Sequence, residues 1–198
     1  MAIYTPPSPQ RSNDGPFDVT EVREAKPFID FGSIRIVPRP DIHLKAEVEE
    51  LNGQVVALTI DYKGSSLQLQ AFAAPKTSGL WQEVRDQLKA NFSAQGAPVE
   101  ERLGNFGPEL VAGIVNSGLG VSFAGRKIAR YVGVDGPRWF LRAIITGPAA
   151  TEPVSAFEMD DIFRGVIINR GEEPIPPRDL LPLTMPESAL MNNRDFLN

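Results

Sequence analysis

The residues best suited to binding an anion are concentrated between positions 126 and 142, where five basic residues accompany a single acid, Asp135. Aromatic residues are interspersed among them. Because an arginine can both stack on a base and hold a phosphate, this combination is typical of a nucleotide or single-stranded nucleic-acid site. The candidate ligand-binding residues are Lys127, Arg130, Tyr131, Arg138, Phe140 and Arg142.

The arrangement of these residues depends on a predicted hairpin of strands 122–134 and 138–146. Asp135-Gly136 between the strands is a favoured pair for a two-residue turn. The ladder pairs predicted from that turn are Gly133 with Arg138, Tyr131 with Phe140 and Ala129 with Arg142. One face is then expected to carry Lys127, Tyr131, Arg138, Phe140, Arg142 and Ile144. The face expected to point into the core carries Ile128, Val132, Trp139, Leu141, Ala143 and Ile145, together with Arg130.

The same cations have a second interpretation, as the charged side of an ordinary sheet. Acids of the segment 17–26, or of the first strands, would then pair with them and cover that face. This interpretation is favoured because solvated sheet faces commonly carry such mixtures of charge. The anion site stays open as the alternative.

Other residues with chemical potential give weaker signals. His43, the single histidine, lies on the polar side of a predicted strand without an identifiable serine or acid partner, which favours a surface position. Asp160 and Asp161 could offer oxygens to Mg²⁺, but neighbours on a helix point roughly 100° apart, which favours a solvated edge. The glycines of Gly118-Leu119-Gly120 lack the helix, lysine or acid of a phosphate loop and are predicted to form a turn. The sequence thus predicts no catalytic set.

The composition excludes further classes of function. The chain has 198 residues, no cysteine and a formal net charge of -5, with an isoelectric point near 5.0. Thiolate catalysis, disulfides and cysteine-ligated metals are therefore excluded, and so is bulk-charge coating of nucleic acid. No apolar run of transmembrane length and no leader-like start is present in the sequence, so we expect a cytoplasmic protein without membrane partners.

The elements that would position these residues follow from hydrophobic periodicity. Three antiparallel strands are predicted over 42–50, 54–62 and 65–74, joined at Asn52-Gly53 and Lys63-Gly64. A helix over 78–95 follows, capped by Ser78, with its apolar stripe on the sheet. Further predicted elements are strands 99–103 and 109–115, the hairpin described above, a helix over 153–164 and the apolar run 166–169.

This order predicts an α+β fold: a mainly antiparallel sheet with two principal helices packed on it, sandwich-like. We expect a single globular domain over 17–170. Residues 1–16 are predicted to form a disordered N-terminal arm, because they are rich in proline and polar residues. Residues 171–198 form a proline-rich C-terminal extension, in which Leu180, Leu181 and Leu183 are expected to lie against the body or a partner.

Four segments together resemble a known family. They are LQLQAFAAPKTSGLWQEVR at 67–85, GNFGPEL at 104–110, YVGVDGPRWFLRAIITGPAA at 131–150 and RGEEPIPPRDLLPL at 170–183. The sequence is similar to the domain of unknown function 3710 family of actinobacterial proteins over roughly 15–186. The resemblance implies a single bacterial cytoplasmic domain and supplies no catalytic residues, cofactor or substrate. The element order is also similar to the Mog1/PsbP-like α/β/α sandwich, at the level of the fold alone.

The function expected from the sequence is a non-enzymatic binding or scaffolding protein that acts through protein–protein contacts. Two alternatives remain: nucleotide or single-stranded nucleic-acid binding through the hairpin 126–142, and a hydrolase that works through converging carboxylates. No cofactor and no metal is expected in any of the three. The protein partner is not identified by the sequence.

Overall fold

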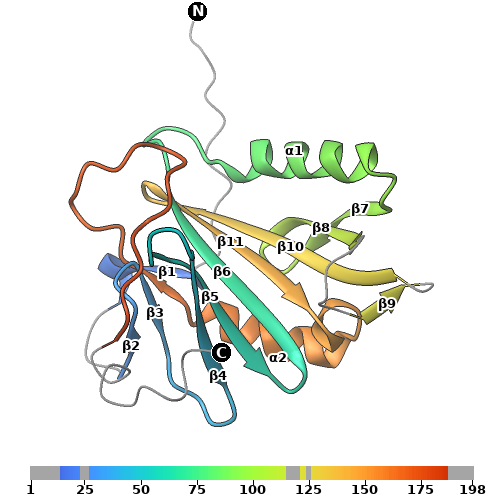
Figure 1. Ribbon diagram of the computed structural model, residues 1–198, viewed down its shortest axis with the longest axis horizontal. Coiled ribbons are helices and arrows are strands. Elements are labelled where there is room, and N and C mark those ends of the chain that lie inside the picture. Colours follow the sequence, from blue (N-terminus) through green and yellow to red (C-terminus); the bar gives the residue numbers. More distant parts are fainter. Residues whose placement is uncertain (1–13, 23–26, 115–120, 124–125, 187–198) are drawn as a thin grey trace, which may run out of the picture.

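Strands dominate the architecture, and the computed structural model describes residues 14–22, 27–114, 121–123 and 126–186. Their large sheet has the order β4-β5-β6-β11-β10-β8-β7, with β9 paired to β10 (Figure 1). Its strands are β4 (His43–Val48), β5 (Val55–Tyr62), β6 (Ser65–Ala73), β7 (Val99–Gly104), β8 (Gly107–Ile114), β9 (Val121–Phe123), β10 (Arg126–Gly136) and β11 (Trp139–Thr146). All its pairs are antiparallel, which confirms the predicted α+β class with a mainly antiparallel sheet.

A second, smaller sheet has the order β1-β12-β3-β2. Its strands are β1 (Phe17–Asp18), β2 (Ile29–Asp30), β3 (Ile34–Ile36) and β12 (Ile167–Ile168). Phe31, Ile34 and Ile168 are fully buried in the larger hydrophobic cluster of the core. The small sheet therefore covers part of one face of the large sheet.

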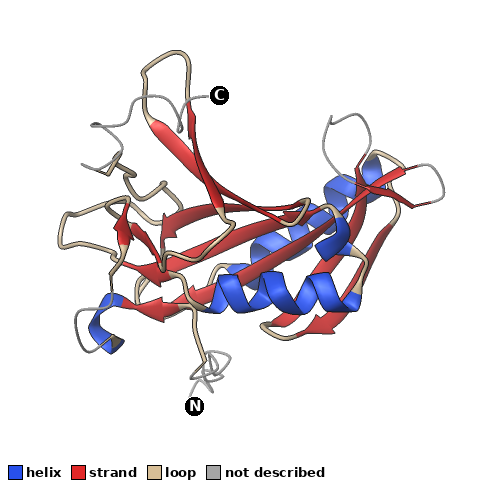
Figure 2. Ribbon diagram, turned by 90° about the horizontal axis from the view of Figure 1, so that it is seen from below, coloured by secondary structure: helices blue, strands red, loops and turns tan. Residues whose placement is uncertain are grey.

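Two α-helices lie on opposite faces of the large sheet (Figures 1 and 2). Helix α2 (Pro153–Arg164) has the predicted bounds, and Met159 and Phe163 pack into the larger cluster with β6 and the 3₁₀ turn η2 (Pro148–Ala150). Helix α1 (Trp81–Ala94) contacts β7, β8 and β10 and belongs to a smaller cluster on the other face. A short 3₁₀ turn, η1 (Val19–Glu21), follows β1.

The coverage of the two faces differs. The larger cluster is covered by α2, the small sheet and the segment 178–184, in which Leu181 and Leu183 are buried while Leu180 stays exposed. That segment runs beside β6, where the backbone N–H of Leu181 donates to the carbonyl of Ala71 at 2.8 Å. On the opposite face, α1 contacts β7, β8 and β10, and the side chains of β4, β5 and β6 there are mostly half-buried or exposed.

Two local predictions were wrong, for reasons visible in the backbone. Asn52-Gly53 does not form a two-residue turn, because the hairpin closes between Glu49 and Gln54, with the Asn52 side chain accepting from the backbone N–H of Gln54 at 2.9 Å. Ser78 does not cap α1, which begins at Trp81 and has no cap from its own neighbouring side chains. By contrast, Lys63 and Gly64 both have positive φ in a two-residue turn, as predicted.

The ends of the predicted domain are partly described. Residues 1–13 of the predicted arm lie outside the described residues, while Gly15 and Pro16 at its end are buried. In the C-terminal extension the described chain reaches 186. The predicted glycine turn at 118–120 also lies outside the described residues.

Candidate ligand-binding face

The hairpin of β10 and β11 turns at Pro137 and Arg138 rather than at Asp135-Gly136, because Gly136 pairs with Trp139. Proline at the first central position and a φ of 63° at Arg138 are typical of a type II turn. Gly136 is needed inside the strand, since a Cβ there would lie 2.0 Å from the Trp139 ring. The predicted turn was therefore wrong.

The different position of the turn changes which residues pair across the hairpin, but not which side of the sheet each side chain is on. Ala129 pairs with Thr146 instead of Arg142, and Tyr131 with Ile144 instead of Phe140. This shift is an even number of residues, and side chains alternate with a period of two, so each strand keeps its predicted inward and outward sides. Arg142 now pairs with Gly133, and Arg138 leaves the ladder for the exposed turn.

Arg130 points into the larger core, on the face predicted for it. Its side chain and that of Glu109 are 3% and 2% exposed, and its Nη2 lies 2.9 Å from Glu109 Oε2. Its Nη1 lies 3.2 Å from Asp160 Oδ1 on α2. Burial disfavours the charged guanidinium, but hydrogen bonds and charges from Glu109 and Asp160 outweigh burial and raise the pKa of Arg130. We call these three residues the arginine–carboxylate cluster.

Neighbouring groups complete that cluster. Arg102 Nε donates to Glu109 Oε1 at 2.7 Å, and the amide of Asn105 donates to Asp160 Oδ2 at 2.8 Å. Asp160 is thus buried in an ion pair, so its predicted place at a solvated edge was wrong. Asp161 is half exposed and forms an ion pair with Arg39. Sequence reasoning missed Glu109, although an arginine predicted on the core face already required a buried acid.

Arg142 lies on the opposite face of the sheet, where its half-buried side chain is close to β6 and to Tyr131 of β10. One Nη donates to the side-chain carbonyl of Gln70, whose amide donates to the Val56 carbonyl at 3.2 Å. The guanidinium carbon lies 5.4 Å from the centre of the Phe72 ring. Among the described residues no carboxylate forms an ion pair with Arg142, and its Nε is buried without a hydrogen-bond partner.

The missing carboxylate shows in the electrostatics. Burial lowers the pKa of Arg142, and the nearby Tyr131 only partly offsets this effect. Burial likewise raises the pKa of the Tyr131 phenol, while the positive charge of Arg142 opposes that rise. The Arg142 guanidinium is therefore held in place and partly desolvated, but it is not neutralised.

An aromatic row borders this arginine. Trp81, the buried residue of α1, stacks at 6.1 Å on Phe140, and Phe140 stacks at 5.9 Å on Phe72. Trp81 can lie flat on β10 because Gly133 has no side chain; a Cβ there would lie 2.2 Å from the indole ring. Arg85, at 5.8 Å from the centre of the Trp81 ring, has a carboxylate partner in Glu101 at 3.0 Å.

The start of α1 is fixed by a residue of the hairpin. Asp135 accepts the backbone N–H of Leu80 at 2.7 Å and that of Trp81 at 3.2 Å. This carboxylate from β10 replaces the cap predicted at Ser78, and it occupies the anion-binding end of the helix. Burial raises the pKa of Asp135, although both backbone hydrogen bonds oppose that rise.

We name the part of the sheet around Arg142 the arginine face. It consists of Gln68, Gln70, Phe72, Tyr131, Arg142 and Ile144, contributed by β6, β10 and β11. Tyr131 is nearly buried under α1, where its ring lies 5.2 Å from that of Phe92. Phe72, Ile144 and both glutamines are half-buried, so the face is accessible beside the helix.

The structure therefore separates the six candidate residues. Arg142 and Tyr131 lie on the arginine face, and Phe140 is buried beneath Trp81. Arg130 lies on the opposite face, and Arg138 is exposed in the turn. The last candidate, Lys127, is half-buried near the far end of β10, opposite Ile114 of β8.

The acids predicted to pair with the cations of the hairpin were those of segment 17–26 or of the first strands, but the groups that contact Arg130 and Arg142 are different ones. Asp18, in the N-terminal segment, accepts the indole N–H of Trp139 at 2.7 Å instead of pairing with an arginine of the hairpin. The acids that reach Arg130 come from β8 and α2, which are neither the N-terminal segment nor the first strands. For Arg142 the first strands supply Gln70, an amide.

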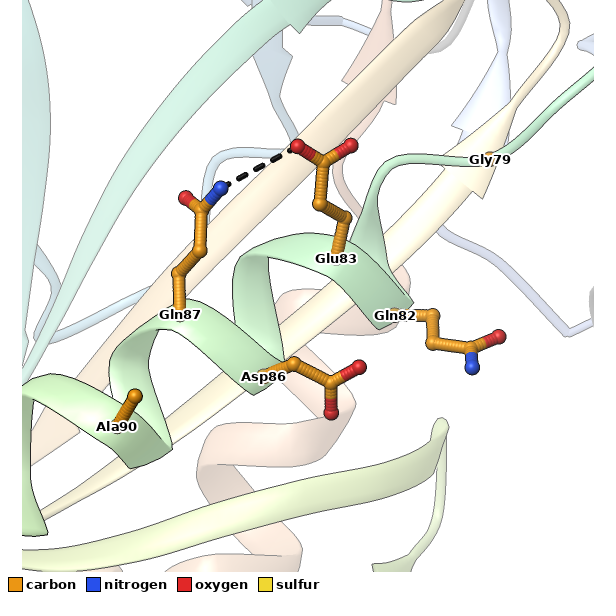
Figure 3. Close-up of a pocket in the computed structure, with 6 residues that line it drawn as sticks. All are labelled: Gly79, Gln82, Glu83, Asp86, Gln87 and Ala90. Carbon is orange, nitrogen blue, oxygen red and sulfur yellow. Dashed lines mark hydrogen bonds between the residues drawn. The ribbon is translucent and has the colours of Figure 1, made fainter.

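A separate hollow lies on the outer side of α1 (Figure 3). It is lined by Gly79, Gln82, Glu83, Asp86, Gln87 and Ala90. Glu83 is engaged by Arg178 at 2.7 Å and by Gln87 at 3.2 Å. Its lining shares no residue with the arginine face, and both of its acids are exposed. The hollow is therefore a surface feature of the helix.

The described residues do not form a metal site or a membrane-spanning helix. Within the described ranges, no group of three or more histidines or acids is placed to hold a metal ion. His43 is exposed on β4. In the part of the chain that the structure describes, no helix is long and apolar enough to cross a membrane.

Comparison with known proteins gives one match. The family described as "Protein of unknown function (DUF3710)" matches residues 15–192. No curated protein and no solved structure matches the chain, so the likeness to the Mog1/PsbP-like sandwich stays a prediction. Because the family match spans well over half of the sequence, the chain belongs to the DUF3710 family of proteins of unknown function.

Proposed function

We propose that this chain is a non-enzymatic binding module that holds a partner protein on the arginine face. The observation that carries the proposal is Arg142, a half-buried guanidinium without a carboxylate partner among the described residues. Burying a charge without a counter-charge costs stability, and arginine is suited to planar anions at interfaces. A partner that supplies the anion accounts for this arrangement. The setting we propose is the bacterial cytoplasm.

The surroundings of Arg142 also favour a protein partner. Phe72 and Ile144 are half-buried apolar residues on the same face, and the α1 residues Val84 and Leu88 next to it are also only partly buried. Interfaces between proteins combine apolar and aromatic contacts with arginine in this way. The accessible part of the sheet beside α1 thus offers a docking surface with a charged centre.

The two alternatives have less support. Nucleic acid would not meet the whole predicted set of residues, since Arg130 is buried in its own ion pairs and Phe140 is buried beneath Trp81. A carboxylate-dependent hydrolase would need acids free to react. Glu109 and Asp160 do converge, but Arg130 engages both of them.

The test is site-specific photo-crosslinking in living cells of the source organism. p-Benzoylphenylalanine replaces Gln68 on the arginine face, or Phe157, which is 64% exposed on α2 and serves as the control position. We expect an adduct of defined mass from position 68 that is absent from position 157. Arg142→Gln should abolish it, whereas Arg39→Gln, at an ion pair with Asp161 of α2 on the opposite face, should not. No adduct from position 68, or one unaffected by Arg142→Gln, would overturn the proposal.

A further inference from the structure

We propose that the group bound by Arg142 is a carboxylate with a large apolar group beside it, presented by an acidic and hydrophobic segment of the partner protein. This inference rests on the proposed function and names the chemistry of its ligand. It is carried by the number of charges at the site, by the groups that hold the guanidinium, and by the apolar residues around it.

The number of charges favours a monoanion. Arg142 is the cation of the arginine face, while Lys127 lies near the far end of β10 and Arg85 is paired with Glu101. The nearby start of α1 cannot help, because the Asp135 carboxylate already occupies its N–H groups. A phosphate dianion usually requires more than one cation or a free helix end. One guanidinium matches one carboxylate.

The guanidinium is held ready for such a ligand. Gln70 accepts from one Nη while its own amide is fixed by the Val56 carbonyl, so the glutamine orients the arginine without neutralising it. Phe72 supports the guanidinium from one side. Such preorganisation lowers the entropic cost of binding, because the side chain is already ordered. The charge stays available to a carboxylate from outside.

The border of the site is apolar. Phe72 and Ile144 on the sheet, with Val84 and Leu88 on α1, are all only partly buried. A large apolar group next to the carboxylate would complete their burial, at roughly 25 cal/mol per Å² of apolar surface removed from water. The segment that fits therefore carries an aspartate or glutamate next to a large hydrophobic residue.

The test uses the full chain and small probes of matched shape. Phenylacetate carries a carboxylate beside a ring, phenylacetamide has the same shape without the charge, and inorganic phosphate has charge without the ring. The reporter is the Nε–H resonance of Arg142, which burial of that atom should protect from exchange; loss of the peak in Arg142→Lys assigns it. We expect phenylacetate to shift this resonance with a dissociation constant on the order of millimolar. Phenylacetamide and phosphate should bind at least about tenfold more weakly.

A second variant keeps Arg142 and tests its charge. Gln70→Glu places a carboxylate of nearly the same shape against the guanidinium, so the folded protein should no longer bind phenylacetate. Arg39→Gln, at an ion pair with Asp161 of α2 on the opposite face of the sheet, should bind it as the wild type does. Equal binding of phenylacetamide, stronger binding of phosphate, or undiminished binding by Gln70→Glu would each overturn the inference.

The two proposals can fail separately. An adduct from position 68 that depends on Arg142, together with no phenylacetate shift, would keep the partner and reject the carboxylate. Loss of both signals would reject the arginine face as a binding surface. A shift by phenylacetate alone, without any adduct, would support the ligand chemistry and overturn the protein partner.

Discussion

Arg130 and Arg142 lie on neighbouring strands of one sheet and have opposite environments. Arg130 is almost fully buried but meets two carboxylates, whose charges raise the pKa of its guanidinium. Arg142 is less buried, meets an amide and no carboxylate among the described residues, and its pKa is lowered, with burial as the largest cause. The difference shows that burial alone does not determine the electrostatic state of a cation. What matters is whether the chain supplies the counter-charge.

The two faces of the sheet on which these arginines lie also differ in how they are covered. The Arg130 face is closed by α2, the small sheet and the segment 178–184, which together form the larger core cluster. On the Arg142 face, α1 contacts β7, β8 and β10 and buries a single one of its own residues, Trp81. We infer that the first face serves stability and that the second is available for binding.

The largest expected effect is that of Arg130→Met. The substitution leaves Glu109 and Asp160 buried without their shared cation, which should lower the free energy of unfolding by about 3–5 kcal/mol. Urea denaturation at neutral pH measures it. Arg102→Met is the control, because Arg102 also contacts Glu109 but is 44% exposed, and should cost less than about 1 kcal/mol. Equal effects of the two substitutions would show that the arginine–carboxylate cluster is not buried as described.

The next largest effects concern two glycines of β10 that lie beneath tryptophan rings on opposite faces. A methyl group at Gly136 would meet the fully buried Trp139, so Gly136→Ala should cost about 1–3 kcal/mol. Gly133→Ala should also destabilise the protein, because a methyl group there would meet the indole ring of Trp81, which donates a hydrogen bond to the Pro108 carbonyl at 2.7 Å. Urea denaturation followed by tryptophan fluorescence measures both. Trp81→Leu should rescue Gly133→Ala and have no such effect on Gly136→Ala; rescue of both would place the two glycines in one cluster.

A smaller effect is expected at Asp135, which caps α1. Asp135→Ala removes the acceptor for the N–H groups of Leu80 and Trp81 and should cost about 1 kcal/mol. Asp135→Asn keeps one acceptor and removes the buried charge. Both changes act on the face of Arg142, so they should leave the arginine–carboxylate cluster intact.

The pH dependence of these variants has a definite sign. Burial raises the pKa of Asp135 in the folded protein above its ordinary value of 3.8. The contribution of this group to stability is therefore fully present below about pH 3.8 and is lost as the pH rises through the folded-state pKa. Relative to Asp135→Asn, the wild type should lose stability over that window, as measured by urea denaturation across a pH series. A constant difference, or one of opposite slope, would contradict the described burial of the carboxylate.

The sequence was sufficient for elements whose signals are local. The bounds of α2, the strands from β4 to β6 and the separation of Arg130 from Arg142 onto two faces all follow from hydrophobic periodicity. They could be predicted because each depends on the spacing of residues within one segment. Even a wrong turn preserved the faces of the hairpin, because side chains alternate along a strand with a period of two.

The failures occurred where a residue serves a distant partner. Asp135-Gly136 has the composition of a turn, but Asp135 is needed at the start of α1 and Gly136 under Trp139. Asp160 has the position of a surface acid on a helix, but it is needed by Arg130. Such requirements arise from packing between segments far apart in the sequence, so no local pattern contains them. The arginine face was foreseen in part, since Arg142, Tyr131 and Ile144 were grouped, while Gln70 was not.

The smallest expected effect on stability, and the sharpest test of the comparison, is that of Arg142→Met. The substitution keeps apolar contact with Phe72 and removes a partly desolvated charge whose Nε has no hydrogen-bond partner, so stability should change by less than about 1 kcal/mol and in the favourable direction. Urea denaturation of Arg142→Met, compared with that of the wild type and of Arg130→Met, measures this change in the free energy of unfolding.

If removal of Arg142 improves stability, then the arginine does not serve the fold, and binding is the role that the arginine face offers. Arg142→Met should therefore fold as well as the wild type and lose the shift caused by phenylacetate. If it instead destabilises the protein as strongly as Arg130→Met, then Arg142 has an internal partner of its own, and the contrast between the two arginines disappears. If the two faces have separate roles, substitution of Arg142 should weaken binding without loss of stability. Substitution in the arginine–carboxylate cluster should lower stability without removing the binding site of the folded protein.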